Sequence, residues 1–143
     1  MTNPTNPQPL NVSFLGLGVM GGAIARHIGQ AGHALTIYNR TPERAARWQE
    51  ANPGLAARVA TSPADAATGA DVVLTCVGND DDLADVVLGP TGVFSAIRKG
   101  AVFIDHTTVS AQVTRELAGI AAGQGIGFVD APVSGGQAGA ENG

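Results

Sequence analysis

The chain has few charged residues, one lysine, one cysteine and no long apolar run. Charged residues make up 14% of 143 positions and the formal net charge is −4, so no general basic field attracts a phosphate backbone and we expect no nucleic-acid partner. The single cysteine, Cys76, rules out an internal disulfide and indicates a reducing, cytoplasmic setting. No apolar run approaches the roughly 20 residues of a membrane helix, so we expect a soluble protein without membrane contact.

The length and the 44% hydrophobic content suit one domain with its own core. Residues 1–9 contain three prolines and neither a basic nor an apolar stretch, so we expect a disordered lead that is neither a signal peptide nor an anchor. The domain then covers residues 10–143. Residues 135–143 read as a loop, not as a finished helix, and this ending predicts a truncated domain.

Buried-type strands alternate with helical patterns along the whole domain. This alternation is typical of βαβ units, and right-handed crossovers between them predict an α/β fold with a doubly wound parallel sheet, the Rossmann dinucleotide-binding fold. The expected strands cover residues 10–15, 34–38, 59–61, 70–77, 101–105 and 127–133, and the expected helices cover 21–31, 42–51, a short segment after 62, a segment ending near 88, and 110–123.

A glycine-rich turn joins the first strand to the first helix. It matches G-x-G-x-x-G in the strand–turn–helix setting that the motif requires. The first glycine permits the tight turn, the second lets a pyrophosphate approach the backbone, and the third allows close packing of helix on strand. The helix N-terminus adds N–H donors for the phosphates, although a glycine turn without a ligand is the alternative. The turn consists of Gly16, Leu17, Gly18, Val19, Met20 and Gly21.

The end of the second strand carries the signal for the type of cofactor. An acid at this place holds the ribose 2′-hydroxyl of NAD, whereas an arginine accommodates the 2′-phosphate of NADP. The sequence has Arg40 here and no acid before Glu43. We therefore expect NADP, with NAD less favoured, and the alternative is that Arg40 is a solvated surface side chain.

These motifs, together with the late segment Asp130–Gly136, resemble the β-hydroxyacid dehydrogenase family, and the resemblance runs from residue 11 to 143. Its members include 3-hydroxyisobutyrate dehydrogenase, tartronate semialdehyde reductase, glyoxylate reductase and the more distant 6-phosphogluconate dehydrogenase. The resemblance implies an NADP-dependent oxidoreductase that interconverts a small 3-hydroxy acid and its semialdehyde or keto form. It also implies that Ser134, Gly135 and Gly136 bind the substrate carboxylate, and that enzymes of this type form homo-oligomers.

The resemblance extends the list of cofactor contacts beyond the glycine turn and Arg40. The added residues are Asn39, Thr41, Val77, Gly78, Asn79 and Thr108. The sequence departs from the family at residues 77–79, where many members have a Leu-Pro pair, so contact there is expected to run through the backbone. His106 stands where a serine is common, and either a catalytic role or that of a plain loop residue remains open.

The family's proton donor is a lysine on the long helix that follows the cofactor domain. The only lysine here, Lys99, precedes a strand and is therefore expected at the amino edge of the sheet, away from the ligands. We expect no catalytic residue and no metal ligand in this chain, an absent C-terminal helical domain, and no activity of the isolated 143 residues. The alternative function is that of a non-catalytic NADP-binding module or an inactive truncated product.

Overall fold

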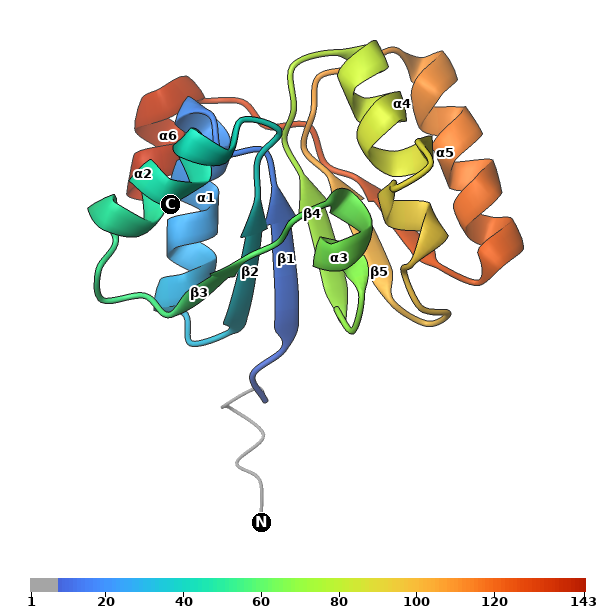
Figure 1. The fold of residues 1–143 in the computed structure, drawn as a ribbon. Helices are drawn as coiled ribbons and strands as arrows, with labels where there is room; N and C mark the ends of the chain where they lie inside the picture. The colour runs from blue at the N-terminus through green and yellow to red at the C-terminus, as the bar shows by residue number, and fades with distance from the viewer. Residues whose placement is uncertain (1–7) are drawn as a thin grey trace.

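The computed structural model describes residues 8–143 as a parallel six-stranded sheet between two layers of helices (Figure 1). The strand order is β3-β2-β1-β4-β5-β6, and every neighbouring pair is parallel. The predicted doubly wound α/β fold is thus confirmed. Most of the predicted disordered lead, residues 1–9, lies outside the described residues. The strands are β1 (Asn11–Leu15), β2 (Ala34–Tyr38), β3 (Ala57–Val59), β4 (Val72–Thr75), β5 (Val102–Asp105) and β6 (Gly127–Asp130).

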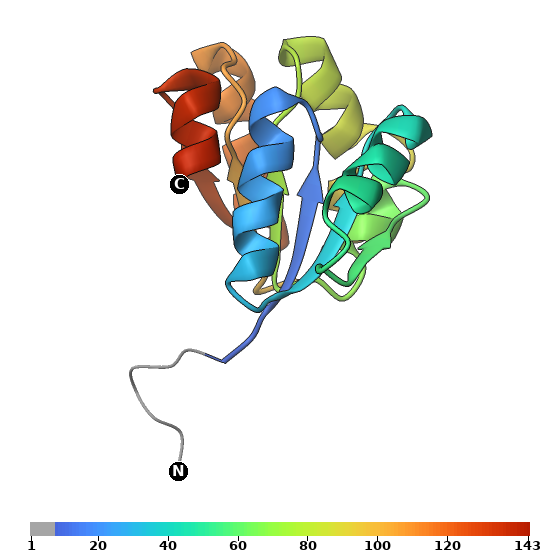
Figure 2. The ribbon, with the colours of Figure 1, turned by 90° about the vertical axis from the view of Figure 1, so that its left-hand side faces the viewer.

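The helices divide between the two faces of the sheet, and each face has its own apolar core. One face carries α3, α4 and α5, which pack with strand residues such as Leu15 and Phe103. The other face carries α1 and α2, which pack with Phe14 and Ile37, while α6 lies against α1 (Figure 2). The helices are α1 (Val19–Gln30), α2 (Pro42–Ala51), α3 (Pro63–Ala67), α4 (Asp80–Leu88), the 3₁₀ turn η1 (Val93–Ser95), α5 (Ala111–Gln124) and α6 (Gly136–Asn142).

The strand order reverses between β1 and β4. From β1 the chain continues to β2 on one side, and from β4 it continues to β5 on the other side. In open parallel sheets ligands bind at such a switch point, outside the carboxyl ends of the strands. The glycine turn after β1 and the loop after β4 lie there, so the fold itself places the cofactor motif at the edge where ligands bind.

The expectation of a loop over residues 135–143 is wrong, since residues 136–142 form α6. Gly135 takes a φ of +102°, which turns the chain into this helix, and α6 then packs on α1. The His27 Nε2 atom lies 2.9 Å from the carbonyl oxygen of Ala140 and 3.0 Å from that of Glu141. A short helix rich in glycine and alanine has a weak local pattern, so this packing decides its conformation.

Three predicted strands also shift by two or more residues at a boundary, and one of them, the fourth strand, covers 72–75, not 70–77. The last strand ends at Asp130, not at residue 133, because its partner β5 ends at Asp105 and the following Pro132 has no N–H to donate. The short third strand covers 57–59, not 59–61. Within residues 8–143 no helix has the length and apolar character that crossing a bilayer requires.

Candidate functional site

Two glycines of the turn are required by the packing of the chain on itself. Gly16 has a φ of +101°, and a Cβ there would clash with the carbonyl of Cys76. A Cβ at Gly21 would clash with the carbonyl of Gly16, because α1 passes directly over the turn. These glycines permit the tight turn and the close helix packing that the sequence predicted.

Gly18 is different, because the surrounding protein leaves room for a side chain there. Its backbone has ordinary extended angles, φ −68° and ψ −169°, and a Cβ would meet nothing nearer than Arg44 Nη1 at 3.8 Å. Helix α1 begins at the next residue without a side-chain cap. The uncapped first turn and the open side of Gly18 fit the approach of a phosphate to the backbone, as dinucleotide binding requires.

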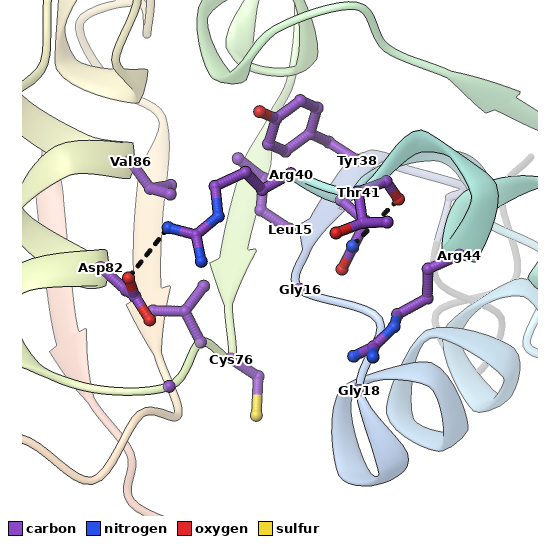
Figure 3. Close-up of a pocket in the computed structure, with 13 residues that line it drawn as sticks. Leu15, Gly16, Gly18, Tyr38, Arg40, Thr41, Arg44, Cys76, Asp82 and Val86 are labelled. Atoms are coloured by element: carbon purple, nitrogen blue, oxygen red, sulfur yellow. Dashed lines mark hydrogen bonds and ion pairs between the residues drawn. The ribbon is translucent and has the colours of Figure 1, made fainter.

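The glycine turn forms the floor of a cleft of about 310 Å³ at the carboxyl edge of the sheet (Figure 3). One wall comes from the segment after β2 and the first turn of α2. The other wall comes from the segment after β4 and from α4. The lining residues are Leu15, Gly16, Gly18, Tyr38, Asn39, Arg40, Thr41, Arg44, Cys76, Val77, Gly78, Asp82 and Val86.

Asn39 joins the wall after β2 to the glycine turn. Its side-chain oxygen accepts a hydrogen bond from the Leu17 amide at 3.0 Å, and its side-chain nitrogen donates to the Thr41 carbonyl at 3.1 Å. The Thr41 hydroxyl forms no capping bond, although Thr41 is the N-cap residue of α2. Asn39 therefore fixes the path of the chain that carries Arg40.

Three charged side chains reach the cleft from its two walls. Arg40 Nη1 donates to Asp82 Oδ1 at 3.1 Å, and the two side chains are 71% and 28% exposed (Figure 3). Arg44 extends instead toward Gly18 and forms no ion pair with residues in the described range 8–143. The sequence interpretation missed Arg44 and Asp82. Arg44 was detectable from its place in the first turn of the predicted helix 42–51, close in sequence to Arg40, whereas Asp82 meets Arg40 only through the fold.

The wall after β4 is held by a buried polar network at the ends of β4 and β5. The hydroxyl of Thr75 donates to Asp105 Oδ1 at 2.9 Å, and the same oxygen accepts from the Thr107 amide at 3.0 Å. The Thr107 hydroxyl in turn accepts from the Val77 amide at 3.0 Å. The side-chain oxygen of Asn79 accepts a hydrogen bond of 2.9 Å from the Asp82 amide and so caps the N-terminus of α4.

Cys76 lines the cleft and is half-buried. Burial and, to a smaller extent, the charge of Asp105 raise the pKa of its thiol. A thiol with a raised pKa stays protonated at neutral pH and is a poor nucleophile. Cys76 therefore contributes an apolar surface to the cleft.

The predicted substrate residues do not share the cofactor cleft. Ser134 and Gly136 line a separate, mainly apolar cavity of about 420 Å³ between α1 and α6, and Gly135 is the N-cap of α6. Met20 lines this second cavity, whereas Gly18 lines the cleft, so the two hollows flank the first turn of α1. The predicted cofactor contact Thr108 is exposed and lines neither of them.

His106 lies at the carboxyl edge, directly after β5. Its Nδ1 lies 2.8 Å from the carbonyl oxygen of Ala131, and since a carbonyl only accepts, Nδ1 carries the proton and Nε2 is left for another partner. Lys99 precedes β5 and so lies at the opposite edge, as predicted. The described part of the chain brings no three histidine, cysteine or acidic side chains together as a metal site.

A helix that starts directly after a glycine turn, at the switch point of a parallel sheet and beside a cleft with two arginines, defines a dinucleotide-binding domain. The chain belongs to the β-hydroxyacid dehydrogenase family, because residues 11–143 match the model for the NAD binding domain of 6-phosphogluconate dehydrogenase. The resemblance seen in the sequence is thereby confirmed.

Two relatives illustrate the range of similar proteins. An uncharacterized oxidoreductase of Shewanella frigidimarina is 54% identical over 92% of this chain and 44% of its own length. The cytokine-like nuclear factor N-PAC of Homo sapiens is 37% identical over 92% of this chain and 23% of its own length. The chain thus spans less than half of the length of these relatives.

Solved structures of the same type match the whole domain. The 3-hydroxyisobutyrate dehydrogenase of Mycobacterium tuberculosis with L-serine is 31% identical, with a TM-score of 0.83 over 94% of this chain and 44% of that one. Psf3 in complex with NADP⁺ and 2-OPP is 27% identical, with a TM-score of 0.83 over 92% of this chain and 45% of that one. The residues present are those of an NAD(P)-binding domain.

Proposed function

We propose that this domain binds NADP(H) and serves an oxidoreductase that acts on a small 3-hydroxy acid. The observation that carries the proposal is that Arg40 and Arg44 line the same cleft as the open face of Gly18. The glycine turn and uncapped helix suit a pyrophosphate, and a guanidinium is suited to the 2′-phosphate that distinguishes NADP from NAD. A similar structure, Psf3, holds NADP⁺, which supports this choice.

In this proposal the cofactor lies along the cleft from the glycine turn toward the ends of β2 and β4. Arg40 holds the 2′-phosphate, and Arg44 lies nearer to the pyrophosphate. Thr108 is proposed to reach the cofactor from the loop after β5, beyond the cleft itself. The proposed cofactor contacts are those of the sequence analysis: Gly16, Leu17, Gly18, Val19, Met20, Gly21, Asn39, Arg40, Thr41, Val77, Gly78, Asn79 and Thr108.

The bound cofactor supplies a hydride donor or acceptor for a hydroxyl carbon of the substrate. Ser134, Gly135 and Gly136 hold the substrate carboxylate in the proposal, through one hydroxyl and backbone amides that no bulky side chain covers. The general acid/base is proposed to come from the part of the relatives' length that this chain does not match. The sole lysine, at the amino edge, is in no position to take that role.

We further propose that the protein is cytoplasmic, because its single cysteine suits a reducing compartment. We also propose that it associates with further copies of itself. Its edge strand β6 exposes Val129 (45%), and Ile120 on the adjoining α5 is 39% exposed. Exposed apolar side chains at an unpaired strand edge favour contact with another copy. Light scattering across a wide concentration range is expected to show dimers or larger species, and a clean monomer throughout contradicts self-association.

The second candidate function is a non-catalytic NADP-binding module. Two observations favour it: the only lysine lies at the amino edge of the sheet, and one group of relatives is named as nuclear factors instead of oxidoreductases. Both candidates require cofactor binding, but only the enzyme also requires a carboxylate site at residues 134–136.

Titration of the chain with NADPH and NADH by calorimetry tests the shared requirement. We expect NADPH to bind at least about tenfold more tightly, which corresponds to one charged hydrogen bond. Equal affinities or a preference for NADH contradict the NADP proposal. A change of Ser134→Ala that weakens the binding of a 3-hydroxy acid to the NADP-saturated chain favours the enzyme, and unchanged binding favours the module.

A further inference from the structure

The cleft places an acid opposite the arginine that is proposed to select the cofactor. Asp82 lies in the first turn of α4, and its Oδ1 accepts from Arg40 Nη1 at 3.1 Å, so the ion pair joins the two walls (Figure 3). In NAD-specific domains of this fold the acid belongs to the end of β2. Here an arginine occupies that end, and the acid comes from the facing wall.

The position of the Asp82 carboxylate is built into the loop after β4. The Asp82 amide donates to the side chain of Asn79 at 2.9 Å, which fixes the first turn of α4. The Asp82 Oδ2 atom lies over Gly78, where a Cβ would come within 2.8 Å of it. The absence of a side chain at Gly78 therefore leaves the space that the carboxylate occupies, and Asp82 is the less exposed member of the pair.

This arrangement affects the two cofactors differently. A 2′-phosphate that binds Arg40 must share its donors with Asp82 and comes near a carboxylate of like charge, whereas the 2′-hydroxyl of NADH is neutral. We infer that Asp82 is a specificity-determining residue that competes with the 2′-phosphate for Arg40 and so limits the preference for NADPH over NADH. The inference rests on the proposed NADP site.

The change Asp82→Asn tests it, because the amide keeps the shape and an acceptor oxygen for Arg40 while the charge is lost. We expect the dissociation constant for NADPH to fall about three- to fivefold, the effect of one partly exposed charge, and that for NADH to change less than about twofold. Asp81→Asn is the matched control, since Asp81 is exposed in the same helical turn and does not line the cleft. This control is expected to leave the ratio of NADPH affinity to NADH affinity unchanged.

Added salt provides a second readout, because screening weakens charge repulsion. The gain from Asp82→Asn is expected to shrink between about 0.05 and 0.5 M salt. The inference is overturned if Asp82→Asn leaves the ratio of NADPH affinity to NADH affinity unchanged or lowers it. It is also overturned if Asp81→Asn raises this ratio equally. The ratio in the unmodified chain reports on the NADP proposal separately, since a wild-type preference for NADH contradicts that proposal whatever the direction of the Asp82→Asn shift.

Discussion

The hydroxyl of Thr107 accepts a hydrogen bond of 3.0 Å from the backbone amide of Val77. Thr107 is buried, and its own amide donates to Asp105, so the end of β5 holds the loop after β4 in place. Val77 and the following Gly78 form a wall of the cleft. A residue outside the cleft thus shapes the surface on which the cofactor is proposed to lie.

The change Thr107→Val is expected to destabilise the domain by about 1–3 kcal/mol, because the amide of Val77 loses its partner while the side-chain volume stays the same. Denaturant unfolding measures this. The matched control Thr108→Val alters an exposed hydroxyl one residue later and is expected to change stability by less than about 0.5 kcal/mol. It is expected to weaken NADPH binding instead. Equal stability of the Thr107→Val variant and the unmodified chain contradicts this account.

The two glycines at the start of the cofactor turn are expected to respond differently to alanine. Gly18→Ala has room for its Cβ within the protein, so we expect a folded domain with a stability loss below about 1 kcal/mol and a loss of affinity for both cofactors. Gly16→Ala places a Cβ against the Cys76 carbonyl at a φ of +101° and is expected to unfold much more easily. Thermal unfolding and cofactor titration separate the two effects. Full cofactor affinity in Gly18→Ala contradicts the proposed approach of the pyrophosphate.

The two arginines of the cleft are expected to have separate roles. Arg44 faces the open side of Gly18, where both cofactors are proposed to place the same pyrophosphate. Arg44→Ala is therefore expected to weaken the binding of NADPH and of NADH by similar factors, on the order of tenfold. Calorimetry with both cofactors measures the two factors. A loss confined to NADPH would assign Arg44 to the 2′-phosphate and refute this division.

The 143-residue chain is expected to show no turnover with 3-hydroxyisobutyrate, glycerate, serine or 4-hydroxybutyrate when saturated with NADP. A positioned base that takes the hydroxyl proton contributes typically 10²–10⁴-fold in rate, and no lysine lies at the carboxyl edge within the described residues. Optical detection of NADPH formation measures this. Turnover of about 1 s⁻¹ or more, the low end of typical enzymes, contradicts the expectation. Loss of that turnover in His106→Ala would assign the proton transfer to His106, whose Nε2 does not contact Ala131.

Periodicity and turn chemistry sufficed to predict the sheet, because the buried strands and the glycine turn have local signatures. The pattern after β1 located Gly16, Gly18 and Gly21, and the structure explains two of them by packing and leaves the third open to a ligand. Helix α6 escaped prediction because its stability comes from contact with α1, which is more than 100 residues earlier in the chain.

The charge balance of the cleft was also beyond prediction from the sequence. The absence of an acid after β2 suggested that nothing opposes Arg40, yet Asp82 reaches it across 42 positions of sequence separation. Only the neighbouring placement of β1, β2 and β4 in the sheet brings these two segments together. Local motifs therefore predict which residues bind a group, and the fold decides which charged side chains lie beside them.

The most direct test of the central claim is a binding cycle with two cofactors and two proteins, the unmodified chain and Arg40→Ala. Calorimetry gives the four dissociation constants. The account predicts that Arg40→Ala costs about 1–3 kcal/mol of binding free energy for NADPH and little for NADH, because only NADPH carries the 2′-phosphate. An equal loss for both cofactors, or no loss for NADPH, contradicts the assignment of this domain to NADP.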